Sequence, residues 1–277
     1  MANSAYGSGI NLDALMVNTK AATVFAAHES SLFLSGGLIP AVTVPAGSMV
    51  AQVPVLGSVA ATKIGAEATP GADLDSVLPS DTKVNINVDL HAARTVLRDL
   101  GGADANDLGR QLGAAVSKSF DTDVATAMGG LTAQEATSAL DLEEIFKAIA
   151  TIRGSGETGQ LTGIVSTGSY AALMNAIGST AYAGGDFQTE ALRNGFVGSI
   201  AGVQMFVSSY LNDTNTGATN AQCAIFGADA MRIAMQKNVD LEIERRAAAV
   251  GFDIVSSLHA GVGVVDATRG VLIADQV

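Results

Sequence analysis

The residues with the clearest capacity for chemistry lie in the second half of the chain, and none of them completes a known catalytic motif. The glycine-rich run at residues 154–159 follows an expected helix and lacks the Gly-Lys-Ser/Thr ending of a phosphate-binding loop, so it is interpreted as a flexible loop. Ser166 and Ser169 stand between a strand and a helix, as a hydrolase nucleophile does, but without a Gly-x-Ser-x-Gly elbow. We therefore expect both serines to cap the helix.

A charged cluster in a strand-like segment is the second candidate. It consists of Glu242, Glu244, Arg245 and Arg246. Carboxylates beside guanidinium groups suit acid–base chemistry, but the pattern is more typical of a solvated strand face or of ion pairs between subunits. We favour the structural interpretation.

Metal binding is not expected. Asp73, Asp75 and Asp81 do not have the spacing of a calcium-binding loop. The histidines lie far apart, and none has a second histidine or a cysteine at ligand spacing. They are His28, His91 and His259. The sequence therefore predicts no metal site, no cofactor and no catalytic residue.

Composition narrows the functional class further. The chain has 277 residues, of which 48% are apolar, enough for the core of one large domain or of two ordinary ones. The net charge of −12 and the lack of a basic run argue against tight wrapping of nucleic acid. The single cysteine, Cys223, excludes an internal disulfide and suits a reducing compartment.

The N-terminal quarter has the features of neither a secretory signal nor a membrane span. Lys20 is the only basic residue among the first 62, and no apolar run follows a charged N-terminal region. Glycines and prolines interrupt the uncharged stretch between Glu29 and Lys63, and they would break a membrane-spanning helix. We expect a protein that acts inside a cell.

One long helix, expected at residues 104–130, must position the rest of the chain. Large apolar residues recur there at every fourth position, whereas Arg110 and Asp121 fall outside this stripe. A helix of about 24 residues is on the order of 35 Å long. We expect its middle, Val116 and Phe120, to pack against the C-terminal strands. The whole stripe is Leu108, Leu112, Val116, Phe120, Val124 and Met128.

An extended excursion precedes this helix. Val50, Val53 and Val55 lead outward, and a return strand at 84–90 alternates apolar and polar residues. The intervening residues 57–81 hold a Thr-Pro-Gly turn signal and few large apolar side chains. Such a segment becomes ordered only by lying on another surface, so we expect it to extend from the body and to contact a neighbouring subunit.

A mixed α/β region follows the helix. Apolar periodicity predicts helices at 142–154 and 186–194 and a capped helix that includes 173–177. Residues 1–45 carry only short apolar clusters, which predicts a short helix followed by an arm with no core of its own. Strands are expected at 161–165, 203–208, 223–226, 239–244, 252–259, 262–265 and 271–273.

Five phrases, taken in their order along the chain, carry a resemblance to a known family. They are QVPVLG at 52–57, TPGADL at 69–74, the helix at 104–128, GSIAGVQMFVS at 198–208 and FGADAMRIA at 226–234. In this order they resemble the major capsid (coat) protein of tailed bacteriophages, especially of short-tailed phages, which has the Hong Kong ninety-seven-type fold. The resemblance covers nearly the whole chain.

The resemblance implies an α+β fold with an N-terminal arm, an extended β-hairpin loop, a peripheral domain with a long spine helix, and an axial domain. It implies a structural protein and not an enzyme. The implied parts are the arm at 1–45, the extended loop at 46–90, the peripheral domain at 91–135, the axial domain at 136–245 and return strands of the peripheral domain at 246–277.

The same resemblance implies a virion protein, assembled in the host cytoplasm. Its copies would form pentamers and hexamers of an icosahedral head that encloses double-stranded DNA without specific binding. Its partners would be other copies of itself, a portal and a possible decoration protein. A separate scaffolding protein is implied because the chain has no room for a scaffolding region before the arm. Some relatives cross-link lysine to asparagine between subunits; Lys63 lies in the corresponding loop, but no partner residue is assigned.

Two other functions stay open at this point. An encapsulin-type nanocompartment would share the fold and package protein cargo. An unrelated serine hydrolase would need an activated serine.

Overall fold

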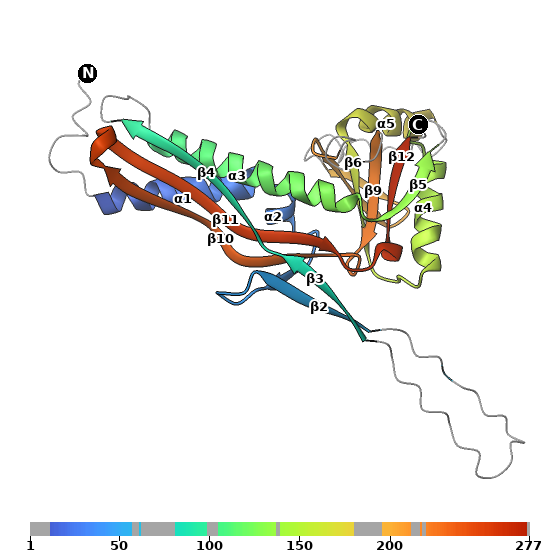
Figure 1. Cartoon of the computed structure of the whole chain (residues 1–277). Helices are drawn as coiled ribbons and strands as arrows, with labels where there is room; N and C mark the ends of the chain where they lie inside the picture. Colours follow the sequence, from blue (N-terminus) through green and yellow to red (C-terminus); the bar gives the residue numbers. More distant parts are fainter. Residues whose placement is uncertain are drawn as a thin grey trace, which may run out of the picture.

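Two β-sheets of different shape organise the chain, and one long helix joins them (Figure 1). The computed structural model describes residues 12–56, 61, 81–98, 105–136, 139–179, 196–211, 217 and 220–275. Its long strands and helices are of the predicted α+β class. Some predictions fall outside the described residues, namely the helix at 186–194, the loop between 62 and 80, Lys63, Asp73 and Asp75.

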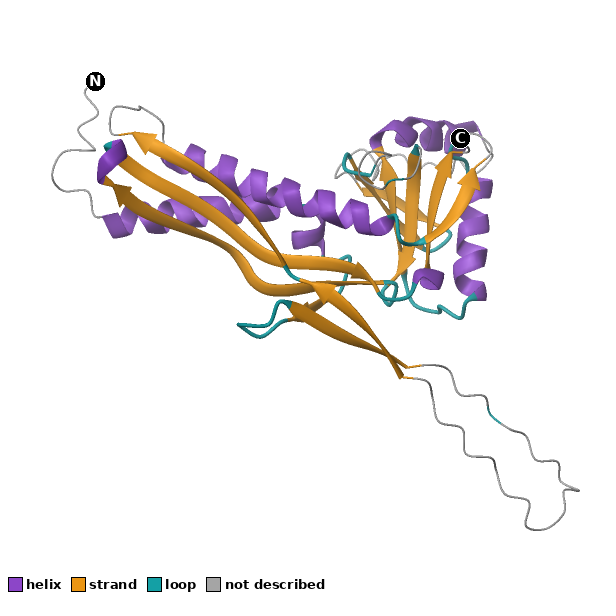
Figure 2. Cartoon of the chain, in the orientation of Figure 1, coloured by secondary structure: helices purple, strands orange, loops and turns teal. Residues whose placement is uncertain are grey.

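The first sheet is long and narrow, with the strand order β1-β10-β11-β4. β10 and β11 form an antiparallel hairpin, β4 pairs antiparallel with β11, and β1 runs parallel to the start of β10. α1 and α3 lie on one face of this sheet (Figure 2). The strands are β1 (Ala41–Thr43), β4 (Asp89–Arg98), β10 (Met231–Arg246) and β11 (Gly251–Val264); the helices are α1 (Leu12–Ser30), α2 (Leu32–Gly36) and α3 (Ala105–Met128).

The second sheet has six strands in the order β5-β12-β9-β6-β8-β7. α4 and α5 cover one of its faces, and the end of α3 approaches the other. The elements are β5 (Thr132–Ala136), β6 (Leu161–Ser166), β7 (Phe196–Ile200), β8 (Val203–Ser208), β9 (Ala221–Gly227), β12 (Gly270–Asp275), α4 (Leu142–Gly154) and α5 (Thr167–Ser179).

A two-stranded antiparallel hairpin of β2 (Val50–Leu56) and β3 (Asp81–Asn87) leaves the long sheet at an angle (Figure 1). The predicted outgoing strand is confirmed. The predicted return strand is interrupted at Val88. Before this residue the chain pairs with β2 as β3, and after it the chain pairs with β11 as β4. The inward-facing positions therefore change from even to odd numbers: Ile86 is 2% exposed and His91 5%, whereas Leu90, expected to face inward, is 64% exposed.

The two sheets divide the chain differently from the predicted parts at three places. β5, a strand that was not predicted, lies at the end of the predicted peripheral range 91–135, but it pairs with β12 in the six-stranded sheet. β10 falls within the predicted axial range 136–245, but it pairs with β11 in the long sheet. β12 falls within the predicted return range 246–277, but it pairs with β5 and β9 in the six-stranded sheet. Periodicity reveals a strand without revealing the neighbour to which it is hydrogen bonded, so the sequence could not assign β10 and β12 to a sheet.

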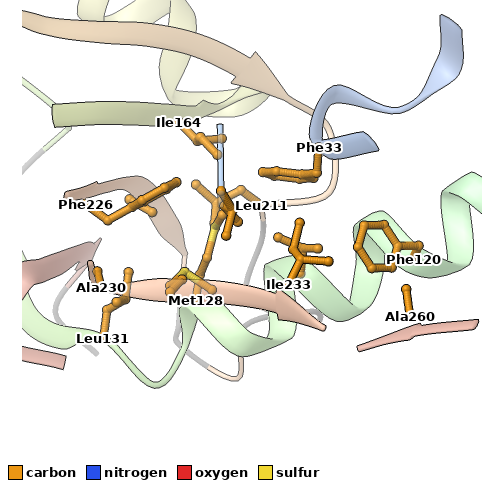
Figure 3. Close-up of a cluster of buried hydrophobic side chains, with 14 of the residues drawn as sticks. Phe33, Phe120, Met128, Leu131, Ile164, Leu211, Phe226, Ala230, Ile233 and Ala260 are labelled. Carbon is orange, nitrogen blue, oxygen red and sulfur yellow. The ribbon is translucent and has the colours of Figure 1, made fainter. Parts of the chain in front are cut away.

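The apolar stripe of α3 forms the main core, as predicted. Its last five members are at most 6% exposed, and Phe120 and Val124 are completely buried. Phe120 lies beside Ala260 of β11, as expected, while Met128 approaches Leu131 and Phe226 below the six-stranded sheet (Figure 3). One helix therefore contributes to the cores of both sheets.

The six-stranded sheet is apolar on both faces, which explains its strongly hydrophobic strands. Successive residues of β6 face opposite sides: Ile164 joins the cluster around α3, and Val165 joins the cluster under α4 and α5. β9 does the same with Ala224 and Cys223. A sheet covered on both faces needs continuous apolar strands and not alternating ones.

α1 packs along α3 through a second stripe that is made of small residues. Gly109, Gly113 and Ser117 follow each other at intervals of four on α3, and they face Thr19, Thr23 and Ala27 on α1. A Cβ atom on Gly113 would overlap the carbonyl oxygen of Thr23, so the two backbones are too close for a larger residue. The predicted short N-terminal helix is therefore a 19-residue helix that is docked on its own chain.

Asp121 is the next member of this second stripe. It lies outside the apolar stripe, as expected, but it is buried, with 1% exposure. Ser31 Oγ, at the N-cap of α2, donates to Asp121 Oδ1 at 2.6 Å, while Oδ2 has no hydrogen-bond partner in the described part of the chain. Burial raises the pKa of Asp121 to about 6, although hydrogen bonds from Ser31 and from the Leu32 amide act in the opposite direction.

Phe120→Ala is expected to lower the free energy of unfolding by about 3–5 kcal/mol, because it leaves a cavity in the core shared by α3 and β11. Chemical denaturation of the purified chain would measure this change. Ala115→Gly, at an exposed position of the same helix, controls for a general loss of helicity at about 1 kcal/mol. A loss below about 1 kcal/mol for Phe120→Ala would contradict the buried position.

Asp121→Asn is expected to stabilise the folded chain at neutral pH. The folded state binds a proton at Asp121 more tightly than the unfolded state, so this group makes wild-type stability fall as pH rises from about 4 to 6. The variant should lose this dependence and be more stable by about 1–3 kcal/mol above pH 7. Denaturation at several pH values would measure it, with the exposed Asp123→Asn as a control that stays within about 1 kcal/mol. Equal pH slopes for wild type and Asp121→Asn would refute the assignment.

Candidate assembly surfaces

The two serines of the possible hydrolase site serve the local structure of α5. Ser166 Oγ accepts from the amide of Ser169 at 3.2 Å, which is the capping role predicted for it. Ser169 does not cap; its hydroxyl receives a hydrogen bond from Ser166 at 3.1 Å. Two of the three histidines bond elsewhere, since His91 Nδ1 contacts Ser119 and His259 Nδ1 contacts Gln236.

A cavity of about 400 Å³ lies beside these serines, at the carboxyl ends of β6 and β8. Thr167, Asn220 and Asp275 also line it. The lining residues that the structure describes include no histidine, lysine or cysteine that would activate a serine. The geometry therefore gives no support to a nucleophilic serine.

The loop at 154–159 is held in place, whereas a flexible loop was expected. Arg153 Nη1 donates to the carbonyl oxygens of Glu157 at 3.0 Å and Gly159 at 2.8 Å. The carboxylate of Glu157 is buried, with 6% exposure, and accepts from the Gly159 amide at 2.8 Å. Its other oxygen is paired with Arg269 at 3.1 Å. The charged side chain inside the glycine run therefore gives this loop its order.

Arg269 connects three separate segments where the chain passes between the sheets. It pairs with Glu157 after α4, with Asp229 in the turn from β9 to β10 at 3.2 Å, and with Asp266 before η3 (Ala267–Arg269) at 3.1 Å. Burial acts to raise the pKa of Asp266, but hydrogen bonds from Thr268 and Arg269 hold it below its usual value. This network stabilises the junction and has the character of a structural clamp.

The charged cluster at 242–246 lies on the distal half of β10. Glu242 and Glu244 are exposed and share the face of the sheet that lies opposite α3. Arg246 approaches Asp253 at 4.0 Å, and the guanidinium of Arg245 lies 5.0 Å from the centre of the Phe252 ring. These exposed positions agree with the structural interpretation, a solvated strand face or ion pairs between subunits.

No metal centre is present in the described residues, where no three His, Cys, Asp or Glu side chains gather closely enough to hold an ion. Within the same ranges, no helix is both long and apolar enough to cross a membrane.

The face of the long sheet opposite α3 is covered by the hairpin root near Gly261 and is exposed along β4 and the distal half of β10. Leu90, Ala92 and Val96 of β4 are exposed on it, beside an ion pair in which Arg94 Nε donates to Asp253 at 2.7 Å. Small apolar areas alternate with charges over this surface, as is typical of a contact between subunits.

The β2–β3 hairpin has one apolar face, and only the part of this face near the body packs on the rest of the chain. Near the body, Ala51 and Ile86 are buried against Val44 and Ala234. Further out, Val53 and Val55 lie on the same face and are only partly covered. An isolated two-stranded ribbon is marginally stable in water, so this face is suited to cover another surface. Residues 62–80 of the predicted excursion lie outside the described residues, while its described base, β2 and β3, has an apolar face that suits contact with a second surface.

Sequence reasoning missed the groups that fix these parts relative to one another. The small stripe of α3 was detectable, because Gly109, Gly113 and Ser117 have the four-residue spacing of close helix contacts. Glu157 was included only as part of a glycine run. Arg269 carried no local signal, since its three partners are distant in sequence.

Neither models of known protein families nor curated proteins match the sequence. Solved structures match its fold. The capsid of cyanophage P-SCSP1u has 16% identity and a TM-score of 0.69, covering 86% of both chains. The mature capsid of bacteriophage PhiM1 has 16% identity and a TM-score of 0.64, covering 87% of this chain and 86% of that chain. A virus-like particle from Pyrococcus furiosus has 13% identity and a TM-score of 0.63, covering 93% of this chain and 98% of that chain.

These similarities confirm the predicted fold. The chain has the fold of tailed-phage capsid proteins, and the match extends over most of both chains. At such low identities the likeness concerns the architecture alone.

Val55→Asp is expected to weaken self-association of the chain by at least tenfold, because it places a charge on the apolar face of the hairpin. The melting temperature should stay within a few degrees, since Val55 lies outside the core. Sedimentation velocity over a concentration series would measure the association. Gln52→Asp, with the same added charge on the opposite face of the same strand, is the control. Equal association of the two variants would refute the role of this face.

Proposed function

We propose that this chain is the major subunit of the head of a tailed bacteriophage. Its copies associate into pentamers and hexamers and close an icosahedral shell around double-stranded DNA. The observation that carries the proposal is the β2–β3 hairpin. Its apolar face extends beyond the part that packs on its own subunit, in a fold shared with phage capsids.

The proposed mechanism is the burial of surface between subunits. The hairpin lies across neighbouring copies, and the six-stranded sheets meet around each capsomer axis in head-to-tail rings. We keep the predicted arm, extended loop, peripheral domain and axial domain. Following their pairing, we transfer β10 to the peripheral part, and β5 and β12 to the axial part.

The proposed role is structural and includes no catalysis. Three observations support this part of the proposal: the cap formed by Ser166, the buried pairing of Glu157 with Arg269, and the solvated position of Glu242 and Glu244. Each of these candidates for chemistry has a structural task or a place on an exposed face.

The proposal includes the partners that the sequence phrases imply: a separate scaffolding protein, a portal and a possible decoration protein. Assembly takes place in the host cytoplasm, and the product is the virion capsid. DNA is enclosed without specific binding, which agrees with a net charge of −12.

A closed compartment for protein cargo is the second candidate. It is less supported than the phage head: among the matching structures reported above, only the virus-like particle from Pyrococcus furiosus, which spans 93% of this chain, is not described as a phage capsid. Both candidates predict a closed shell, so the contents of the shell and not its shape discriminate between them.

Electron microscopy of the purified chain, expressed alone and with scaffolding proteins of tailed phages, tests the proposal. Closed icosahedral particles are expected. At about 0.15 M salt, emptied particles should bind DNA only weakly, with a Kd above about 1 μM, because the subunit is acidic. Particles that copurify with one folded protein in constant proportion would favour the compartment. An exclusively monomeric chain under both conditions would contradict both candidates.

A further inference from the structure

The root of the hairpin crosses the long sheet in an unusual way. β4 pairs with β11 as far as Asp89 and Ala260, and the preceding residues then leave the plane of the sheet and pass over the face of β11. The positions directly under this crossing are Gly261 and Gly263. Neither glycine has a positive φ, so the space and not the backbone conformation requires glycine there.

The two glycines differ in what they contact. A Cβ atom on Gly261 would overlap the carbonyl oxygen of Asn87 and lie 2.9 Å from its carbonyl carbon and 3.3 Å from the Val88 Cα. These are backbone atoms, so only a movement of the whole strand could relieve the overlap. A Cβ atom on Gly263 would lie 2.9 Å from Cγ1 of the buried Ile86, a side-chain atom, so its contact can be relieved by a shift of that side chain while the backbone of the crossing strand stays in place.

A β-bulge holds the other strand of the root. The pairing of β10 with β11 is irregular between Met235 and Lys237, which sets Gln236 outside the regular ladder. Gln236 Nε2 donates to the Ser48 carbonyl at 2.6 Å in the turn before β2, and its Oε1 lies 3.1 Å from His259 Nδ1. The amide of Val88 also donates to the Met49 carbonyl at 2.8 Å.

We propose that Gln236 and Gly261 form a seat that sets the direction in which the hairpin leaves the body. Because the hairpin extends far beyond the seat, a small displacement at Gly261 is amplified along it. This second step rests on the proposed function: the direction of the hairpin sets the angle between neighbouring subunits and therefore the size of the closed shell.

The direction can be measured in the unassembled subunit, by the distance between spin labels at Thr82→Cys on β3 and Gln111→Cys on α3. Both positions are exposed. The native Cys223 is completely buried, and burial raises the pKa of its thiol, so it does not react with the labels. Gly261→Ala should change the mean distance by more than about 2 Å, because Thr82 lies about 17 Å along the strand from the crossing.

Gly263→Ala is the matched control and should leave the distance unchanged. An unchanged distance in Gly261→Ala would overturn the seat. If Gly261→Ala shows no cooperative melting, Gln236→Ala takes its place: a broader distance distribution supports the seat, and an unchanged one overturns it.

Particle diameters of the same unlabelled variants test the second step. Gly261→Ala should give particles of changed diameter or open sheets, and Gly263→Ala particles of wild-type size. A shifted distance with wild-type diameters would overturn the link to shell size. If the wild-type chain forms no shell, the proposed function fails, while the distances still decide whether the seat directs the hairpin.

Discussion

The apolar stripe of α3 is the constraint on which the rest of the structure depends. Phe120 packs beside the long sheet and Met128 below the six-stranded sheet, so both sheets cover one helix. Each of its fully buried large side chains contributes about 1.5–3 kcal/mol. Removing either sheet would expose part of the stripe, so the two sheets form one cooperative unit. The exposed part of the long sheet and the hairpin therefore have defined directions relative to the six-stranded sheet.

The elements that could be predicted from sequence are those in which the apolar pattern of one segment already shows which of its residues are buried. α3 shows its stripe at a four-residue spacing, and β6 and β9 are apolar throughout because both faces of their sheet are covered. β5 and β7 escaped prediction because they are short edge strands, and the sequence TAQEA of β5 lacks an apolar run. The strands at 252–259 and 262–265 are one continuous β11, since its glycines 261 and 263 look like a turn and in fact accommodate a crossing strand.

What could not be predicted depends on partners that are distant in sequence. Asp121 looked like a surface residue because its partner, Ser31, lies in another helix. The hairpin was recognisable from its alternating valines, but its root was not: Gln236 acts through a bulge that exists only once β10 and β11 are paired. Periodicity reports which side of an element is buried. It carries no information about which element covers that side, and the fixed geometry of this chain comes from such pairings.

In the described part of the chain, the large exposed apolar side chains are scattered over different elements. Phe25, Met49, Leu90 and Val250 are each more than 60% exposed, but they lie on α1, at the hairpin root, on β4 and at the tip of the β10–β11 hairpin. Scattered residues of this kind do not create the large continuous patch that causes aggregation. If the proposed function holds, association must then come from several small contacts with different neighbours. Small contacts are individually weak and reversible, so a wrongly placed subunit can leave before the shell closes, whereas a correctly placed one is held by all its neighbours together.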